Sequence, residues 1–138
     1  MSKIRRVAII GGNRIPFMRS NTAYSYASNM DMLSATLQGL VKRFDLEGER
    51  LGEVAAGAVM KHSRDFNLAR EATLNSGLAL ETPAYDIQQA CGTGLEAAIL
   101  VANKIALGQI DAGIAAGTDT ASDAPIALNE NYRRMVLD

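Results

Sequence analysis

The chain has 138 residues, with 14 Lys and Arg against 15 Asp and Glu and a formal net charge of −1. At roughly 100–200 residues per domain it is one domain or part of one, and its 48% hydrophobic and 21% charged residues are typical of a folded protein rather than a disordered one. The near-neutral charge gives no electrostatic reason to expect nucleic acid or an anionic membrane as a partner.

The first predicted strand is Arg6–Gly11, a continuous apolar run bounded by charge and glycine, which is typical of a strand buried on both faces. A helix is predicted from about Asp31 to Phe44, where leucines recur at steps of four and three. Either Asn29 or Asp31 can cap its start, because both side chains can accept a hydrogen bond from a free backbone N–H.

A second strand is predicted at Val54–Met60, where small residues indicate the close approach of a helix or another backbone. A short helix at Asn67–Ser76 and an extended segment at Pro83–Gln88 follow. The strongest helix is predicted at Cys91–Leu107, and a fourth strand at Ala112–Gly117. This βαβαβαβ order favours an α/β fold, with a mostly parallel sheet and helices on both of its faces.

The helix predicted at residues 91–107 is apolar on nearly every side. It contains the longest uninterrupted apolar run of the chain, Ala97–Ala102, which is far short of the ~20 residues that a membrane span needs. A helix that is apolar all round has to be enclosed, and a chain of this length can hardly surround it alone. We therefore expect a further layer over this helix, supplied by a partner or by additional chain.

Cys91 is the only cysteine, and it lies where the third strand turns into this helix. A single cysteine excludes an internal disulfide and a multi-cysteine zinc site, and no other metal site is indicated. The first turn of a helix carries free N–H groups and the positive end of the helix dipole, which stabilise a thiolate or an oxyanion. Gly92 and Gly94 leave room for a substrate to approach the sulfur. The pattern favours a nucleophile over the alternative, an inert and small hydrophobic residue.

Four short motifs, in chain order, resemble those of the thiolase family. The family's Arg-x-Pro-Phe turn is matched by Arg14–Phe17, and its Asn-x-Ala-Arg helix start by Asn67–Arg70. The nucleophile motif, Cys-Gly-Ser/Thr-Gly, is matched by Cys91–Gly94. A Gly-Gly-x-Glu-x-x-Ser stretch is matched by Ala116–Ser122, with alanine at its first position and aspartate at its fourth. The resemblance covers about residues 4–125.

This resemblance implies an acyl-CoA C-acyltransferase with the N-terminal half of a thiolase-like fold. In such enzymes the cysteine accepts an acyl group from a coenzyme A thioester. The acyl-enzyme then condenses with a second acyl-CoA, or in the reverse direction a 3-ketoacyl-CoA is cleaved by CoA; covalent catalysis divides one difficult step into two. The thioester is a substrate, and no permanently bound cofactor is implied. Cys91, with its own backbone N–H as an oxyanion donor, is the one catalytic residue that carries over.

The resemblance also implies that the catalytic His, the second Cys and most CoA contacts lie beyond this portion of the enzyme. We therefore expect residues 1–117 to form the α/β half and residues 118–138 to begin an inserted loop region. The expected partners are an acyl-CoA, the C-terminal half of the enzyme and, because thiolases are dimers or tetramers, further copies of the subunit. The N-terminus lacks a secretory leader of usual length, so we expect a cytoplasmic protein with a reduced thiol.

Other polar residues are weaker candidates for chemistry. His62 lies in a loop outside the family's His motif and is interpreted as a solvated or hydrogen-bonded loop residue. Asp119 and Asp123 could be paired carboxylates, but are interpreted as part of a solvated loop. Three hypotheses follow: an acyltransferase of thiolase type, a non-catalytic interaction module, and an unrelated ligand-binding α/β domain with an inert cysteine.

Overall fold

The computed structural model describes residues 4–138 of the chain. Its helices are α1 (Asn29–Arg43), α2 (Leu68–Leu74), α3 (Thr93–Ala106) and α4 (Glu130–Leu137), with a short 3₁₀ helix, η1 (Ser63–Asp65). Its strands are β1 (Glu53–Ala56), β2 (Ala84–Asp86) and β3 (Gly113–Ala115). The predicted α/β fold is confirmed, and all three predicted helices and the last three predicted strands lie at the expected positions.

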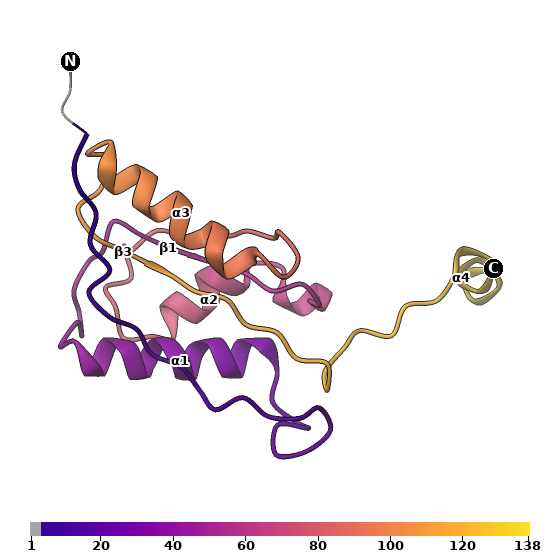
Figure 1. Cartoon of the computed structure of the whole chain (residues 1–138). Coiled ribbons are helices and arrows are strands. Elements are labelled where there is room, and N and C mark those ends of the chain that lie inside the picture. The colour runs from indigo at the N-terminus through magenta and orange to yellow at the C-terminus, as the bar shows by residue number, and fades with distance from the viewer. Residues whose placement is uncertain (1–3) are drawn as a thin grey trace.

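The three strands form a parallel sheet with β1 in the centre, in the order β2-β1-β3. Val54 of β1 pairs with Ala84 on one side and with Ile114 on the other. The chain passes from β1 outward to β2 and then back across β1 to β3. Because such crossovers are right-handed, α2 and α3 cover opposite faces of the sheet (Figure 1).

Alternate side chains of β1 enter two separate cores, as expected for a strand covered on both faces. Val54 and Ala56 belong to the larger core, which α1 and α2 complete. Ala55 belongs to a smaller core with Ala97 and Val101 of α3. Of the small residues predicted to let another element approach closely, Ala55 therefore lies where α3 packs on the sheet.

A polar cluster joins α3 to the start of β1. The buried carboxylate of Glu53 accepts hydrogen bonds from Lys104 and, at 3.3 Å, from the Tyr85 hydroxyl. The hydrogen bond to Glu53 raises the pKa of Lys104, while burial raises the pKa of Tyr85. The Lys104 ammonium also lies 4.8 Å from the centre of the Tyr85 ring, a cation–π geometry. Since a buried charge requires partners, this cluster fixes α3 against the sheet.

A capping box begins α1, in place of either predicted cap. Ser28 is the N-cap: its Oγ accepts the Asp31 N–H at 3.1 Å, and Asp31 Oδ2 accepts the Ser28 N–H at 2.9 Å. The hydrogen bonds from the Ser28 hydroxyl and then from its backbone N–H lower the pKa of Asp31. Asn29 is fully buried, and its Nδ2 donates to the Met60 carbonyl at 2.7 Å.

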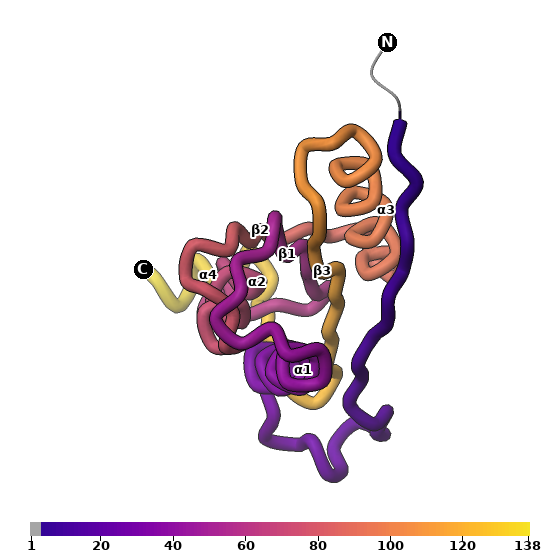
Figure 2. Tube along the Cα trace, turned by 90° about the vertical axis from the view of Figure 1, so that its left-hand side faces the viewer, coloured from indigo at the N-terminus to yellow at the C-terminus, as the bar shows by residue number. Residues whose placement is uncertain are grey.

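The first predicted strand, Arg6–Gly11, does not form. This segment is extended and runs past the β3 side of the sheet (Figure 2). Arg5 anchors it through a 2.9 Å backbone hydrogen bond to the end of α3, and Asn13 through a 2.9 Å side-chain bond to a carbonyl of α1. Ile9 and Ile10 are 94% and 86% exposed. The prediction of a strand buried on both faces is therefore wrong, because a strand also needs a neighbouring strand with which to share a ladder of hydrogen bonds.

Residues 118–138, which are expected to begin an inserted loop region, contain the helix α4 near their end. Asn129 caps this helix, accepting the Tyr132 N–H at 2.9 Å. No residue of α4 is buried, and the helix lies apart from the sheet and the other helices (Figure 1). Local caps and side-chain pairs, rather than core packing, therefore define it. Among residues 4–138, no helix is long and apolar enough to cross a membrane.

One side of α3 remains uncovered. Its inner side packs on β1, whereas Leu95, Ile99 and the C-cap Leu107 are 70%, 44% and 64% exposed. The sequence predicts a further layer over this helix. Within residues 4–138 the surface that such a layer would cover is open.

Candidate functional site

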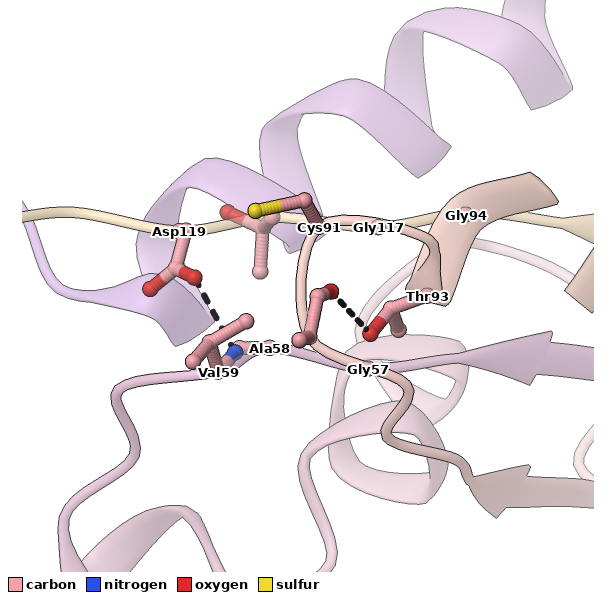
Figure 3. Close-up of a pocket in the computed structure, with 10 residues that line it drawn as sticks. Gly57, Ala58, Val59, Cys91, Thr93, Gly94, Gly117 and Asp119 are labelled. Atoms are coloured by element: carbon pink, nitrogen blue, oxygen red, sulfur yellow. Dashed lines mark hydrogen bonds between the residues drawn. The ribbon is translucent and has the colours of Figure 1, made fainter. Parts of the chain in front are cut away.

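The segments that follow the three strands meet at one edge of the sheet. The carboxyl ends of parallel strands lie together, and ligands bind at this edge in open α/β sheets. Residues of Gly57–Val59, Ala90–Gly94 and Gly117–Asp119 line a pocket of about 320 Å³ there (Figure 3). The predicted nucleophile, Cys91, is among them.

Cys91 occupies the turn between β2 and α3, and its side chain is exposed over the pocket (Figure 3). α3 begins at Thr93, two residues later than predicted, with Gly92 as its N-cap. The N–H groups of Gly92 and Thr93 donate to the carbonyls of Gln89 and Ala90 at 2.9 and 3.2 Å. Cys91 thus lies at the predicted strand-to-helix turn, but two amides predicted to be free are used within that turn.

Backbone strain and one hydroxyl group shape this turn. Ala90 has a φ of 46°, in the left-handed region that residues with a Cβ rarely adopt. Thr93 Oγ1 accepts the Gln89 N–H at 2.9 Å and donates to the Ala90 carbonyl at 2.8 Å. Strained backbone persists only where its surroundings impose it, so Thr93 holds the conformation that presents Cys91.

Glycines allow the walls of the pocket to approach each other. A Cβ on Gly57 would lie 1.8 Å from the Ile87 carbonyl oxygen, so no side chain fits at this point. A Cβ on Gly94 would meet nothing within 4 Å, which agrees with the predicted open space beside the sulfur. A Cβ on Gly92 would instead lie 3.1 Å from the Gln89 side chain, on the turn.

Asp119 joins two walls of the pocket. Its Oδ2 accepts the Val59 N–H at 3.0 Å, drawn in Figure 3, and its Oδ1 accepts the Met60 N–H at 3.2 Å. From the sequence, Asp119 is interpreted as part of a solvated loop, because nothing in a polar segment reveals a backbone partner 60 positions away. The one available signal is the motif in which Asp119 takes the place of a glutamate.

A wider groove of about 1000 Å³ adjoins the pocket. The segment Asn13–Ser20, which contains the Arg-x-Pro-Phe match, lines one part of it, and Gly117–Ser122 lines another. Gly117, Thr118 and Asp119 line both spaces. Asp119 therefore stands at the boundary between the groove and the Cys91 pocket.

The remaining motif, Asn67–Arg70, lies elsewhere and has a structural role. Asn67 is the N-cap of α2, within the helix start that the motif predicts. Arg70 donates to the carbonyls of Thr82 and Leu80 at 2.7 and 2.8 Å. Neither Asn67 nor Arg70 lines the pocket or the groove. The fold therefore brings three of the four motifs to one site and uses the fourth to hold the segment before β2.

His62 and Asp123 form a cluster away from the pocket. His62 Nε2 lies 2.9 Å from the Asp123 carbonyl oxygen and 3.4 Å from Asp123 Oδ1. Asp123 also accepts a hydrogen bond from Arg64, which lowers the pKa of Asp123 and raises that of Arg64. His62 is confirmed as a hydrogen-bonded loop residue. Asp119 and Asp123 have different partners, so they form neither a carboxylate pair nor a fully solvated loop.

The pocket offers a thiol surrounded by backbone and small side chains. Within the part of the chain that the structure describes, Cys91 and Asp119 are the titratable residues of its lining, and no three His, Cys, Asp or Glu residues could together hold a metal ion. An accessible thiol can attack an electrophilic carbon that enters such a space. The chemistry that the site supports is therefore nucleophilic.

Comparisons with known proteins agree on one family. Residues 7–137 match the model of the thiolase N-terminal domain. The chain is 34% identical over 132 residues to a 3-ketoacyl-CoA thiolase of Vibrio cholerae, covering 96% of this chain and 30% of that protein. It is 33% identical over 137 residues to a 3-ketoacyl-CoA thiolase of Shewanella sp. strain ANA-3, covering 99% and 31% of the two chains.

The fold gives the same result. A crystal structure of the acetyl-CoA acetyltransferase of Bacillus anthracis matches with a TM-score of 0.74 and 28% identity, over 87% of this chain and 29% of that one. The chain thus spans about three tenths of the length of the relatives that it matches. Because the family model covers nearly all of the sequence and the fold agrees with that of a solved member, this chain belongs to the thiolase family and corresponds to its N-terminal domain.

Proposed function

We propose that this chain supplies the nucleophile of an acyl-CoA C-acyltransferase, and that the nucleophile is Cys91. The observation that carries the proposal is the position of Cys91, which is exposed in the pocket lined by the segments that follow all three strands. The relatives are named 3-ketoacyl-CoA thiolases and an acetyl-CoA acetyltransferase, which supports a coenzyme A thioester as the substrate.

In the acyl-transfer step, the Cys91 sulfur forms a bond to the thioester carbonyl carbon, and the bond from that carbon to the CoA sulfur breaks. The Cys91 proton ends on the departing CoA sulfur, so one thiol and one thioester are exchanged without an oxidant. The acyl group then passes to the enolate of a second acyl-CoA. In the opposite direction, CoA cleaves a 3-ketoacyl-CoA. The covalent intermediate divides the overall reaction into two easier steps.

The shape of the pocket supports the approach of a thioester to this sulfur. A Cβ on Gly94 would meet open space, and Gly117 faces Gly94 with room for only a small group between them. The backbone N–H of Cys91, in the turn just before the N-cap of α3, is the proposed donor to the developing oxyanion, because a backbone N–H directed at such a charge stabilises it. Thr93 fixes the turn on which both the sulfur and this N–H lie.

We propose that the proton acceptor of the reaction comes from another part of the enzyme. Within residues 4–138 the pocket lining includes no histidine, and His62 contacts Asp123 instead. We propose that the remaining catalytic groups belong to a C-terminal half, as the family resemblance implies. The open side of α3 is the proposed surface for that half, because its exposed leucine and isoleucine side chains favour burial.

Intact-mass measurement after incubation with acetyl-CoA tests the function. The chain is incubated alone and together with the C-terminal part of a related thiolase, supplied as a separate polypeptide. With the C-terminal part present, we expect one acetyl group on the wild-type chain and none on C91A. C91S is the matched control, because it keeps the size of the side chain but is a weaker nucleophile, and it should be acetylated far more slowly.

Two outcomes would contradict the proposal. One is an acetyl adduct that persists in C91A, because the acylated group would then be a different residue. The other is a wild-type chain that stays unmodified even when the C-terminal part is present and bound.

A non-catalytic α/β interaction module with an inert cysteine is the second candidate. It is favoured by the lining of the pocket, which contains no basic side chain within the described residues. The rate of alkylation by iodoacetamide at pH 7 separates the two candidates. An activated Cys91 should react faster than the thiol of an unstructured peptide, whereas an equal or slower rate favours the module.

The compartment and the assembly of the enzyme are also proposals. We propose a cytoplasmic location, and a homo-oligomer, which the family resemblance supports. Cell fractionation tests the first. Sedimentation of the enzyme with its C-terminal part present tests the second, and a monomer at all concentrations would contradict it.

A further inference from the structure

We propose that Asp119 is a positioning residue for acyl transfer, which holds the loop after β1 in the shape that receives the thioester opposite Cys91. This inference rests on the proposed function. It starts from the two hydrogen bonds, of 3.0 and 3.2 Å, that the carboxylate accepts from the Val59 and Met60 amides. Asp119 also lines both the Cys91 pocket and the adjoining groove.

The carboxylate extends the contact between β1 and β3 beyond the sheet. The Ala116 N–H donates to the Ala55 carbonyl at 2.9 Å, and the Thr118 N–H donates to the Gly57 carbonyl at 3.0 Å. Past this point, Asp119 replaces main-chain pairing with its side chain. Two successive N–H groups that point to one side form a natural site for an anion, and hydrogen bonds to a charged acceptor are stronger than neutral ones. The Asp119 side chain, in the loop after β3, therefore fixes the backbone conformation of the loop after β1.

The loop has a second anchor, which keeps the test of Asp119 informative. Asn29 of α1 is fully buried and donates from Nδ2 to the Met60 carbonyl at 2.7 Å. When the Asp119 carboxylate is removed, Met60 is still tied to α1. The expected change is a shift of Val59 and of the two amides, rather than unfolding of the loop.

The consequence for acyl transfer follows from the size of the reagent. A thioester has to be aligned between Cys91 and the wall that contains Val59, and a displacement of about 1 Å from the reactive geometry can cost about 100-fold in rate. Iodoacetamide is small and needs no such alignment. Loss of the Asp119 contacts should therefore slow acetylation of Cys91 much more than its alkylation.

The experiment compares the two rate constants on the same thiol in four variants. D119N keeps the size of the side chain but puts an NH₂ donor against one of the two amides, and D119A removes both acceptors. D119E keeps the charge and both oxygens. D123N is the matched control, because it removes the ion pair with Arg64 in the same segment without a contact to Val59 or Met60.

We expect the ratio of acetylation to alkylation rates to fall about tenfold or more in D119N and D119A, to recover largely in D119E and to remain unchanged in D123N. Hydrogen exchange of the Val59 and Met60 amides should accelerate in D119N, which checks the contact without any chemistry at Cys91. If D119A does not fold, the ratio of acetylation to alkylation rates measured for D119N tests the proposal.

Different failures have different meanings. A wild-type chain that forms no acetyl adduct contradicts the proposed function and this inference with it. A wild-type chain that is acetylated, with an unchanged ratio in D119N, overturns the role of Asp119 alone. An equal fall in D119N and D123N would also overturn it, because general loosening of the segment would then explain the effect.

Discussion

Ala90 adopts a backbone conformation that favours glycine, immediately before the cysteine that we propose as the nucleophile. For a residue with a Cβ, the left-handed region costs roughly 1–2 kcal/mol. The Thr93 hydroxyl, which binds both Gln89 and Ala90, offsets this by fixing the turn. Strain of this kind is often found at functional sites, where it holds a side chain in place.

Replacement of Ala90 by glycine should therefore stabilise the fold. We expect A90G to raise the free energy of unfolding by about 0.5–1 kcal/mol, because relief of the strain exceeds the greater freedom of glycine in the unfolded chain. Urea denaturation measures this. The matched control is A115G in β3, which has no strain to relieve and should destabilise by about 0.5–1 kcal/mol. Equal destabilisation by both variants would show that Ala90 is not strained.

Gly57 presents the opposite case, a glycine that is needed for space. A Cβ there would lie 1.8 Å from the Ile87 carbonyl oxygen, so G57A has to push apart the segments that follow β1 and β2. We expect a loss of about 2 kcal/mol or more in the free energy of unfolding, as for overpacked cores. G12A should change it by less than about 0.5 kcal/mol, because a Cβ on Gly12 would meet nothing within 4 Å. Similar effects of the two substitutions would contradict this.

The sequence alone could identify some residues of the candidate site but not others. Cys91 and Gly94 were predictable, because a motif at a strand-to-helix turn constrains local geometry. Asp119 was not, since its partners Val59 and Met60 are distant in the chain and are backbone groups that any residue carries. The strain at Ala90 was also unpredictable, because alanine favours ordinary helical or extended backbone.

At the scale of elements, the pattern of apolar, small and turn-forming residues predicted α1, α2 and α3 and the three strands of the sheet. It failed for Arg6–Gly11, whose apolar run records a tendency to be buried but does not identify a neighbouring strand. It also missed α4, because this helix is defined by its local caps and has no buried residue that would give an apolar pattern. The N-cap of α1 is Ser28, one residue before the nearer predicted cap, Asn29. Ser, Asn and Asp are all capping types, and only the tertiary burial of Asn29 decides among them.

The capping box of α1 should contribute measurably to stability. S28A removes the hydroxyl that accepts the Asp31 N–H, and we expect it to lower the free energy of unfolding by about 1 kcal/mol. S28T keeps an acceptor and should lose much less. Chemical denaturation at neutral pH measures both. Equal stability of wild type and S28A would show that the cap contributes nothing.

This contribution should depend on pH in a defined direction. The folded protein holds the pKa of Asp31 below its ordinary value of 3.8, so the carboxylate stabilises the fold fully above pH 3.8 and loses this effect as pH falls through the lower, folded-state pKa. The difference in unfolding free energy between wild type and D31N should therefore shrink below about pH 4. A difference that grows on acidification would contradict the assignment.

At the scale of the molecule, the exposed apolar side chains of α3 determine behaviour in solution. We expect the isolated chain to associate with increasing concentration, because contiguous exposed apolar surface favours aggregation or partner binding. The double variant L95Q/I99Q should reduce this association in sedimentation experiments, whereas I126Q, outside α3, should change it little. A stable wild-type monomer at all concentrations would contradict the expectation. The sequence could predict that α3 needs a cover, but not which residues provide it.

The pairing of β1 with both β2 and β3 has a consequence for biosynthesis. Val54 and its partner Ile114 are 60 positions apart, and ribosomes add about 5–20 residues per second. After β1 leaves the exit tunnel, its second edge therefore stays without a neighbour for roughly 3–12 s. An unpaired edge is a template for strands of other molecules, so the nascent chain is open to pairing between molecules at this edge until β3 emerges.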